Sequence, residues 1–438
     1  MLLSVVDRRR RVHQAAAIRS CLLLLSLILA RPLAALQSPD AARLTVTEAV
    51  RQAVERSPAV TAARSRVEAA ESSVRGARAP YNPQAELAPG VGFTNGNALL
   101  SQRFDVAGRR SAEARVQVGE QAASVAEWER TRLQAAGEAR LAYYELARAR
   151  AVEAATQETA DLARQLRDAV RRRVEIGEAP AVQVTRAEIE VGRVEQELIR
   201  ARGDASSRLA TLNRLLGLEP TRPQVLADQM DVPEAPANIT DLVEQALNRR
   251  PELSSARALV QAQQGQVDVA RSQRRPDLFA EFASDLWSLD RDAFRSRNLG
   301  FQVRLSMPLF DRGRIRAEVD RARAGVRERA AEVEVVRRTL AVEVERAAAE
   351  LATAREIALN YRQTLLPRSQ ELLKASRSGF EIGLTSFLEV LEAQRVLRQA
   401  QTEYLTSLTE ALRAQIALER ALGVAPGLEP ALPLSERK

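Results

Sequence analysis

The chain has 438 residues and a formal net charge of +8, and it contains one cysteine, Cys21, and one histidine, His13. Both fall within the first 35 positions, which resemble a removable export signal. Without that segment the chain has no thiol and no imidazole. This excludes disulfides, cysteine-based zinc sites, Ser-His-Asp triads and Cys-His dyads.

The predicted secretory signal covers residues 1–35. Arg8–Arg11 form its basic start, Cys21–Ala30 its apolar core and Ala34–Ala35 its small residues for cleavage. The signal carries six Arg and one Asp, so its removal lowers the net charge from +8 to +3. Because Arg and Glu are interleaved along the rest of the chain, we expect no basic face for nucleic acid.

The chain is internally duplicated. Residues 47–83 match residues 240–276 without a gap at a constant spacing of 193, and Glu175–Gly177 recurs at Glu381–Gly383. The two copies are therefore expected to fold in the same way. The expected segments are a signal peptide at 1–35, a first repeat at 36–218, a proline-rich linker at 219–238, a second repeat at 239–424 and a tail at 425–438.

In the first repeat, a short helix precedes two strands and two long helices. Alternating apolar and polar residues predict strands at 84–93 and 98–106, joined by a tight turn at Thr94–Asn97. Arg109–Ile176 contains no proline and is rich in helix-forming residues, which predicts a helix on the order of 100 Å long. The turn Gly177–Pro180 and a returning helix over Val182–Leu216 complete a helical hairpin.

The second repeat has the same predicted layout. Strands are expected at Leu278–Trp287 and Leu299–Met307, followed by a long helix, a turn at Gly383–Ser386 and a returning helix over Phe387–Leu422. The long helix carries two apolar stripes with a seven-residue period, which is typical of a left-handed coiled coil. The stripes are Val319, Val326, Val333, Leu340, Ala347, Ala354 and Tyr361, and Val344, Leu351, Ala358 and Leu365.

The predicted strands have one apolar and one polar face. Phe301, Val303 and Leu305 alternate with Gln302 and Arg304, so we expect the first three to face lipid and the other two to face a lumen. A small sandwich core is the alternative. The membrane interpretation is favoured because four strands are too few to close a barrel and their apolar edges need partners. Three chains would supply twelve strands.

The turn of the second repeat carries the most specific signal. Phe380–Gln394 (FEIGLTSFLEVLEAQ) is similar to the periplasmic turn of the outer membrane efflux, or TolC-like, family. The duplicated layout resembles that family from about Leu44 to Val424. Asn82–Pro83 and the stretch from Leu100 to Arg110 resemble its heavy-metal-efflux branch.

The resemblance implies a fold and a set of partners. The fold would be mainly α with a small β part, in which coiled-coil hairpins form an α-barrel and the four strands contribute to a trimeric twelve-stranded outer membrane β-barrel. The protein would be a homotrimeric exit duct that extends into the periplasm and is surrounded by outer membrane lipid. It would dock on a periplasmic adaptor (membrane fusion) protein and an inner-membrane efflux pump, with no cofactor and no enzymatic activity.

The resemblance also implies a pore constriction. Glu389 and Glu392 match acidic positions of the family's turn and lie on one helical face, so threefold symmetry would give six carboxylates that attract cations. Gln183 stands where the family usually has Asp, and Arg186, one helical turn later, is a candidate basic partner. Because Thr385 replaces a residue that is sometimes basic, an Arg–Asp latch is not expected.

The two turns are expected to form the rim that docks on the adaptor. They contain Gly177, Pro180, Gly383 and Thr385, and both glycines should adopt positive φ. Other functions stay open at this stage: the outer membrane component of a type I protein secretion system, a periplasmic coiled-coil scaffold without a pore and, more remotely, an enzyme. The sequence does not identify the exported substrate.

Overall fold

The computed structural model describes residues 43–88, 96–236, 238–287 and 299–428. The predicted signal peptide, the predicted turn residues Thr94 and Asn95, and the end of the tail lie outside these ranges. The chain divides into two units, residues 1–44 with 223–226, and residues 45–222 with 227–438. In the first unit, strands β1 (Arg43–Leu44) and β4 (Val225–Leu226) form a parallel pair.

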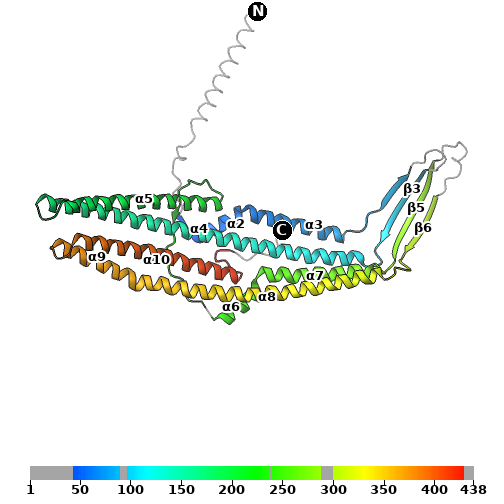
Figure 1. Cartoon of the computed structure of the whole chain (residues 1–438). Helices are drawn as coiled ribbons and strands as arrows, with labels where there is room; N and C mark the ends of the chain where they lie inside the picture. The colour runs from blue at the N-terminus through cyan, green and yellow to red at the C-terminus, as the bar shows by residue number, and fades with distance from the viewer. Residues whose placement is uncertain (1–42, 89–95, 237, 288–298, 429–438) are drawn as a thin grey trace, which may run out of the picture. The chain divides into compact units, whose positions relative to one another are not determined.

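The second unit contains two successive sets of elements in the same order: two helices, a strand pair, a long helix and a returning helix (Figure 1). The first set is α2 (Val46–Arg56), α3 (Pro58–Arg78), β2 (Gln84–Ala88), β3 (Gly96–Phe104), α4 (Arg109–Glu175) and α5 (Val182–Leu215). The second set is α6 (Ile239–Arg249), α7 (Pro251–Ser272), β5 (Asp277–Trp287), β6 (Leu299–Ser306), α8 (Arg314–Asn360), α9 (Leu366–Glu381) and α10 (Phe387–Ala421). The predicted fold class, mainly α with a small β part, is confirmed.

Each set opens with two helices where the sequence predicted one. The second helix begins at Pro58 in the first set and at Pro251 in the second. The preceding residues, Ser57 and Arg250, have extended backbone with ψ of 121° and 123°. A proline disfavours helical backbone at the residue before it but suits the first helical turn, so both sets break at the matching position.

The long helices follow the prediction. The helix α4 has 67 residues, and α5 and α10 begin at the predicted residues. The helix α4 packs against α3, α5, α7 and α10, while α8 packs against α7 and α10 (Figure 1). The long helix predicted in the second repeat is interrupted, because a π-helical segment at Tyr361–Leu365 separates α8 from α9.

The helix α8 buries most of its predicted apolar stripes. Leu340 and Ala347 of the first stripe are buried, as are Val344 and Leu351 of the second. Leu365 is exposed instead. It lies in the π-helical segment, where the wider i to i+5 turn changes the angular position of successive side chains and ends the seven-residue period.

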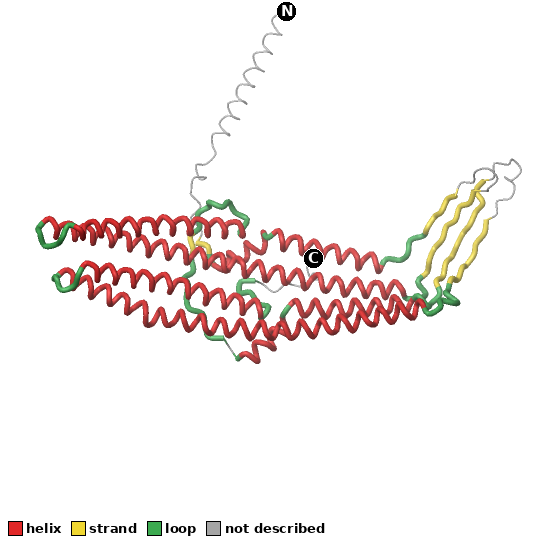
Figure 2. The backbone as a smooth tube through the Cα atoms, viewed as in Figure 1, coloured by secondary structure: helices red, strands yellow, loops and turns green. Residues whose placement is uncertain are grey.

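The four longer strands form one antiparallel sheet in the order β2-β3-β5-β6 (Figure 2). Strands β5 and β6 agree with the prediction to within one residue. Gly96 and Asn97, which were predicted to lie in a turn, belong to β3, because pairing with β5 extends the strand to these residues. The pairing of β3 with β5 also joins the two sets of elements. Over the described residues, no helix combines the length and the apolarity needed to cross a bilayer.

Candidate functional site: the strand faces and the helical turns

One face of the sheet exposes large apolar side chains. Phe301, Val303 and Leu305 on β6 are 70%, 61% and 57% exposed. The strand register places Phe282 opposite Phe301 and Leu278 opposite Leu305, so the apolar face continues onto β5. The structure thus gives this face the apolar character that the alternation indicated, and its contact with lipid stays a prediction.

The opposite face of the same strands carries polar and charged groups. The Glu281 carboxylate on β5 is only 4% exposed. It accepts hydrogen bonds from Gln302 Nε2 and Arg304 Nε, both at 2.8 Å. The Arg304 guanidinium also lies 4.5 Å from the centre of the Phe279 ring. Gln302 and Arg304 therefore share a face distinct from the apolar one, and its exposure to a lumen stays a prediction.

The two helical turns close with the same backbone motif. Gly177 and Gly383 have φ of +79° and +80°, which confirms the prediction of positive φ. The Glu178 amide donates to the Arg173 carbonyl at 2.8 Å, and the Leu384 amide donates to the Gly379 carbonyl at 2.8 Å. Each turn is thus a Schellman motif, in which a left-handed residue satisfies the last carbonyls of the helix.

The returning helices begin differently. At α10 the Ser386 hydroxyl accepts a hydrogen bond from the Glu389 amide, and the Glu389 carboxylate accepts one from the Ser386 amide. This reciprocal pair is a capping box. At α5 the residue before the helix is Ala181, which has no side-chain cap. The second turn is therefore fixed more firmly by its side chains than the first.

The candidate constriction residues all lie just after the two turns. Gln183 is half-buried, while Arg186, Glu389 and Glu392 are exposed. Within the described ranges, no hydrogen bond or ion pair joins Gln183 or Arg186 of α5 to the two glutamates of α10. The structure therefore does not pair Arg186 with either carboxylate, and the assignment of these four residues to a constriction stays a prediction.

Sequence reasoning missed a buried carboxylate that connects the two hairpins. Glu190 on α5 is buried, and its Oε2 lies 3.2 Å from Arg395 Nη2 on α10. Arg398 of α10 lies 4.0 Å from the other oxygen and pairs with Glu197 of α5 at 3.1 Å. Glu190 lies seven residues after Gln183 and hence on the same helical face, which is the signal that could have identified it.

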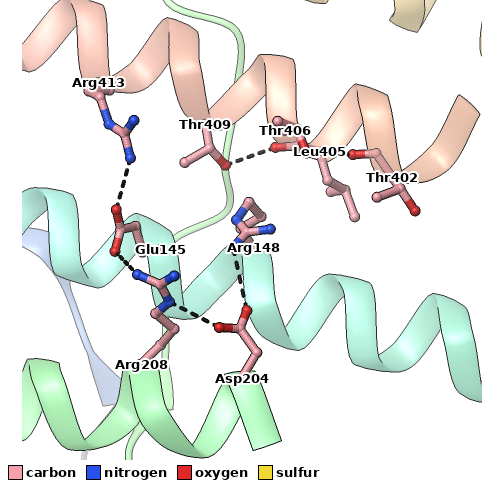
Figure 3. Close-up of polar contacts among 9 residues, drawn as sticks. All are labelled: Glu145, Arg148, Asp204, Arg208, Thr402, Leu405, Thr406, Thr409 and Arg413. Carbon is pink, nitrogen blue, oxygen red and sulfur yellow. Dashed lines mark hydrogen bonds and ion pairs between the residues drawn. The ribbon is translucent and has the colours of Figure 1, made fainter. Parts of the chain in front are cut away.

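Farther along, a second charged network joins α5 and α10 through residues of α4 (Figure 3). Glu145 on α4 accepts from Arg413 on α10 at 2.9 Å and from Arg208 on α5 at 2.6 Å. Arg208 also contacts Asp204, which pairs with Arg148 of α4. Since one α4 carboxylate binds arginines from two other helices, the network fixes how the two hairpins lie side by side.

Comparisons with known proteins agree with this architecture. The family model described as outer membrane efflux protein matches residues 49–218 and 242–424. The chain is 30% identical over 269 residues to the cobalt-zinc-cadmium resistance protein CzcC of Cupriavidus metallidurans, covering 60% of this chain and 62% of that protein. It is 28% identical over 408 residues to protein CyaE of Bordetella pertussis, covering 87% and 84%.

A solved structure of CusC superposes with a TM-score of 0.73 at 20% identity, covering 86% of this chain and 92% of that one. This likeness supports the fold. The match to CzcC spans less than two thirds of the length of CzcC. The family model, by contrast, covers both sets of helices and strands and most of the chain. The chain therefore belongs to the outer membrane efflux protein family and is a protein of the outer membrane.

Proposed function

We propose that the chain is the exit duct of a tripartite efflux system. Three copies would close the four-stranded sheets into a twelve-stranded barrel, and the long helical hairpins would continue the duct into the periplasm. The observation that carries this proposal is the sheet itself. It exposes an apolar face while its edge strands β2 and β6 lack a second partner in the described chain.

The duct would conduct passively, with the energy supplied by an inner-membrane pump. A hydrocarbon environment tolerates strands only when every backbone group is paired, as in a closed barrel. Closure through three copies satisfies the edges of β2 and β6, and it places the polar face with Glu281 and Arg304 around the lumen. A scaffold without a pore would leave the apolar face at Phe301 and Val303 in water, which is unfavourable.

The two Schellman turns are the proposed contact with the periplasmic adaptor. Ile382 and Leu384 at the second turn are strongly exposed apolar residues, as is Ile176 at the first. Cysteines placed at Glu178 and Leu384 should therefore crosslink to the adaptor in cells. A duct that stays active while neither cysteine crosslinks would place the docking rim elsewhere.

Divalent metal ions are the first cargo to test. The support for this choice is the name of CzcC, a cobalt-zinc-cadmium resistance protein. Deletion of the gene should sensitise cells to one of these metals, and restoration of the gene should reverse the effect. A strain whose tolerance to all three metals is unchanged would argue for a different cargo.

The duct proposal itself is tested by assembly and conductance of the purified chain. The protein should fractionate with the outer membrane, migrate as a heat-sensitive trimer and form channels in planar bilayers. A monomer that remains in the soluble periplasmic fraction would contradict the proposal. Val303→Arg should reduce trimer recovery. Lys374→Gln, a change at an exposed position on a helix, is the control and should leave trimer recovery unchanged.

A further inference from the structure

A cavity of about 300 Å³ lies between α4 of the first hairpin and α9 and α10 of the second. Its size is at the lower end of ligand pockets, which is suited to a small molecule. The walls are apolar where Leu166 of α4, Phe380 of α9 and Val390 of α10 line it. Phe380 and Val390 are buried, so the cavity extends inward from the surface.

A polar group without a partner lies in this apolar wall. Gln394 lines the cavity and is 7% exposed. Its Nε2 is buried and forms no hydrogen bond within the described residues. A buried N–H donor without an acceptor is unfavourable, so an oxygen atom of a bound molecule at this position would be stabilised.

The rim of the cavity is cationic. Arg172 and Arg377 line it and are exposed, and neither forms an ion pair within the described ranges. Arg173 is already engaged, since its guanidinium lies over the Phe380 ring at 4.7 Å and its Nε lies 3.7 Å from Glu178. Glu381 is the acidic residue of the lining, so the arginines outnumber it.

We propose that this cavity binds a small aromatic carboxylate that carries a second oxygen acceptor at the far end of its ring. The carboxylate would pair with Arg377 or Arg172 at the rim, where a guanidinium binds both oxygens. The ring would lie against Phe380 and Val390, and the second oxygen would accept from Gln394 Nε2. A carboxylate with an alkyl group at that end would cover the amide without satisfying it.

The ligand would touch both hairpins at once. Because α4 belongs to the first set of elements and α9 and α10 to the second, a molecule bound between them favours the packed arrangement of the hairpins. Binding should therefore raise the apparent unfolding temperature, by an amount that continues to rise with the logarithm of the free ligand concentration above Kd. This inference does not depend on conduction, so the experiment is made on binding alone.

The test uses the purified full chain in lipid nanodiscs and calorimetric titration with two matched probes. These are 4-acetylbenzoate, which has the second acceptor, and 4-isopropylbenzoate, which has nearly the same shape without it. The first should bind about fivefold more tightly, as expected for satisfying a buried donor. The uncharged 4-acetylbenzamide should bind more weakly than 4-acetylbenzoate.

Two variants separate the role of Gln394 in the cavity wall from that of the arginines at the rim. Gln394→Leu should abolish the preference between the two probes, because no donor remains to be satisfied. Arg377→Gln should weaken both probes about threefold, which is typical of an exposed charge pair, and should keep the preference. Lys374→Gln, one turn earlier on α9 and outside the cavity, is the matched charge control and should change neither affinity.

The wild-type protein alone can overturn the proposal. Absence of binding, or equal affinity for the two benzoates, would contradict it even if Gln394→Leu fails to fold. Equal weakening by Arg377→Gln and Lys374→Gln would also contradict it, because it would reduce the effect to general charge. A channel that conducts normally but shows no binding would refute this site and leave the duct proposal intact.

Discussion

Gly119 of α4 lies directly against Ala262 of α7: a Cβ at Gly119 would be 2.6 Å from the backbone nitrogen of Ala262. The contact is reciprocal, because a Cβ at Gly265 of α7 would lie 2.9 Å from the backbone nitrogen of Val116 of α4. The two glycines allow a close crossing of helices from the first and second sets. No rotamer change can relieve a clash with backbone atoms.

Gly119→Ala should therefore destabilise the protein by ~1–3 kcal/mol, as overpacking does in a filled interior. Gly203→Ala on α5 is the matched control, since its Cβ would meet no atom of the described residues within 4 Å. That control should be neutral or stabilising by up to about 1 kcal/mol, because alanine is the better helix former. Thermal unfolding followed by circular dichroism measures both. Equal midpoints for the two variants would show that the helices can separate without cost.

The second prediction concerns Gly177 and Gly383. Among the described residues, no atom would lie within 4 Å of a Cβ at either position, so only their positive φ resists substitution. Replacing either glycine with Val should cost on the order of 1–2 kcal/mol, whereas Asn, which tolerates left-handed backbone, should cost less. Midpoints of thermal unfolding that rank Val level with Asn would rule out backbone conformation as the cause.

Much of this fold could be predicted from local sequence. The helix α4 was expected to end at Ile176 and ends one residue earlier, because a proline-free run of helix formers before a glycine specifies its own limits. The break at Pro58 was missed although the signal is local. The ion pairs of Glu190 with Arg395 and Arg398 were missed for a different reason. They join helices far apart in the chain, so the seven-residue spacing from Gln183 could place Glu190 on the same helical face but could not show which charges it meets.

The third prediction separates the two faces of β6. Val303→Arg should reduce the stability of the assembled protein by ~2–4 kcal/mol if this residue lies near the bilayer midplane. Arg304 requires a paired change because it neutralises the buried Glu281. The double variant Glu281→Gln with Arg304→Gln should keep the trimer and alter single-channel conductance. Similar losses of trimer in both variants would refute the assignment of the faces.

The fourth prediction concerns pH and Glu129 of α4. Burial raises the pKa of this carboxyl group, and nearby Arg132 lowers it by less. The folded state therefore holds the proton more tightly than the unfolded state. Protonated Glu129 therefore stabilises the folded state. This stabilisation is complete below the usual carboxyl pKa of about 4.3 and is lost as the pH rises through the raised pKa of Glu129 in the folded protein.

Glu129→Gln should accordingly stabilise the protein at pH 7 relative to wild type, and the advantage should shrink as the pH falls through the raised pKa and vanish below about 4.3. Unfolding midpoints measured across this range test the sign. Glu120→Gln, an exposed carboxyl on the same helix, is the matched control. A Glu129→Gln variant that is less stable than wild type at pH 7 would show that the carboxylate has a partner in the assembled protein.

The last prediction concerns the proposed constriction at Glu389 and Glu392. Glu389 also caps α10 through Ser386, so a change of charge must not remove the cap. Gln is suited to this purpose because its side-chain oxygen can accept the same hydrogen bond in a capping box. Glu392 is exposed and lies 3.8 Å from Arg395, a surface pair that contributes little to stability. The double variant Glu389→Gln with Glu392→Gln should therefore keep its unfolding midpoint and its trimer.

In planar bilayers that double variant should lose cation selectivity and become less sensitive to block by multivalent cations. A threefold ring would remove six carboxylates from the narrow end of the duct, where charge acts most strongly on permeating ions. Glu371→Gln with Glu381→Gln on α9 is a control with the same change in net charge. If the control alters selectivity as much as the test variant, the effect comes from overall charge. Unchanged selectivity in a well-folded Glu389 and Glu392 double variant would place the constriction at other residues.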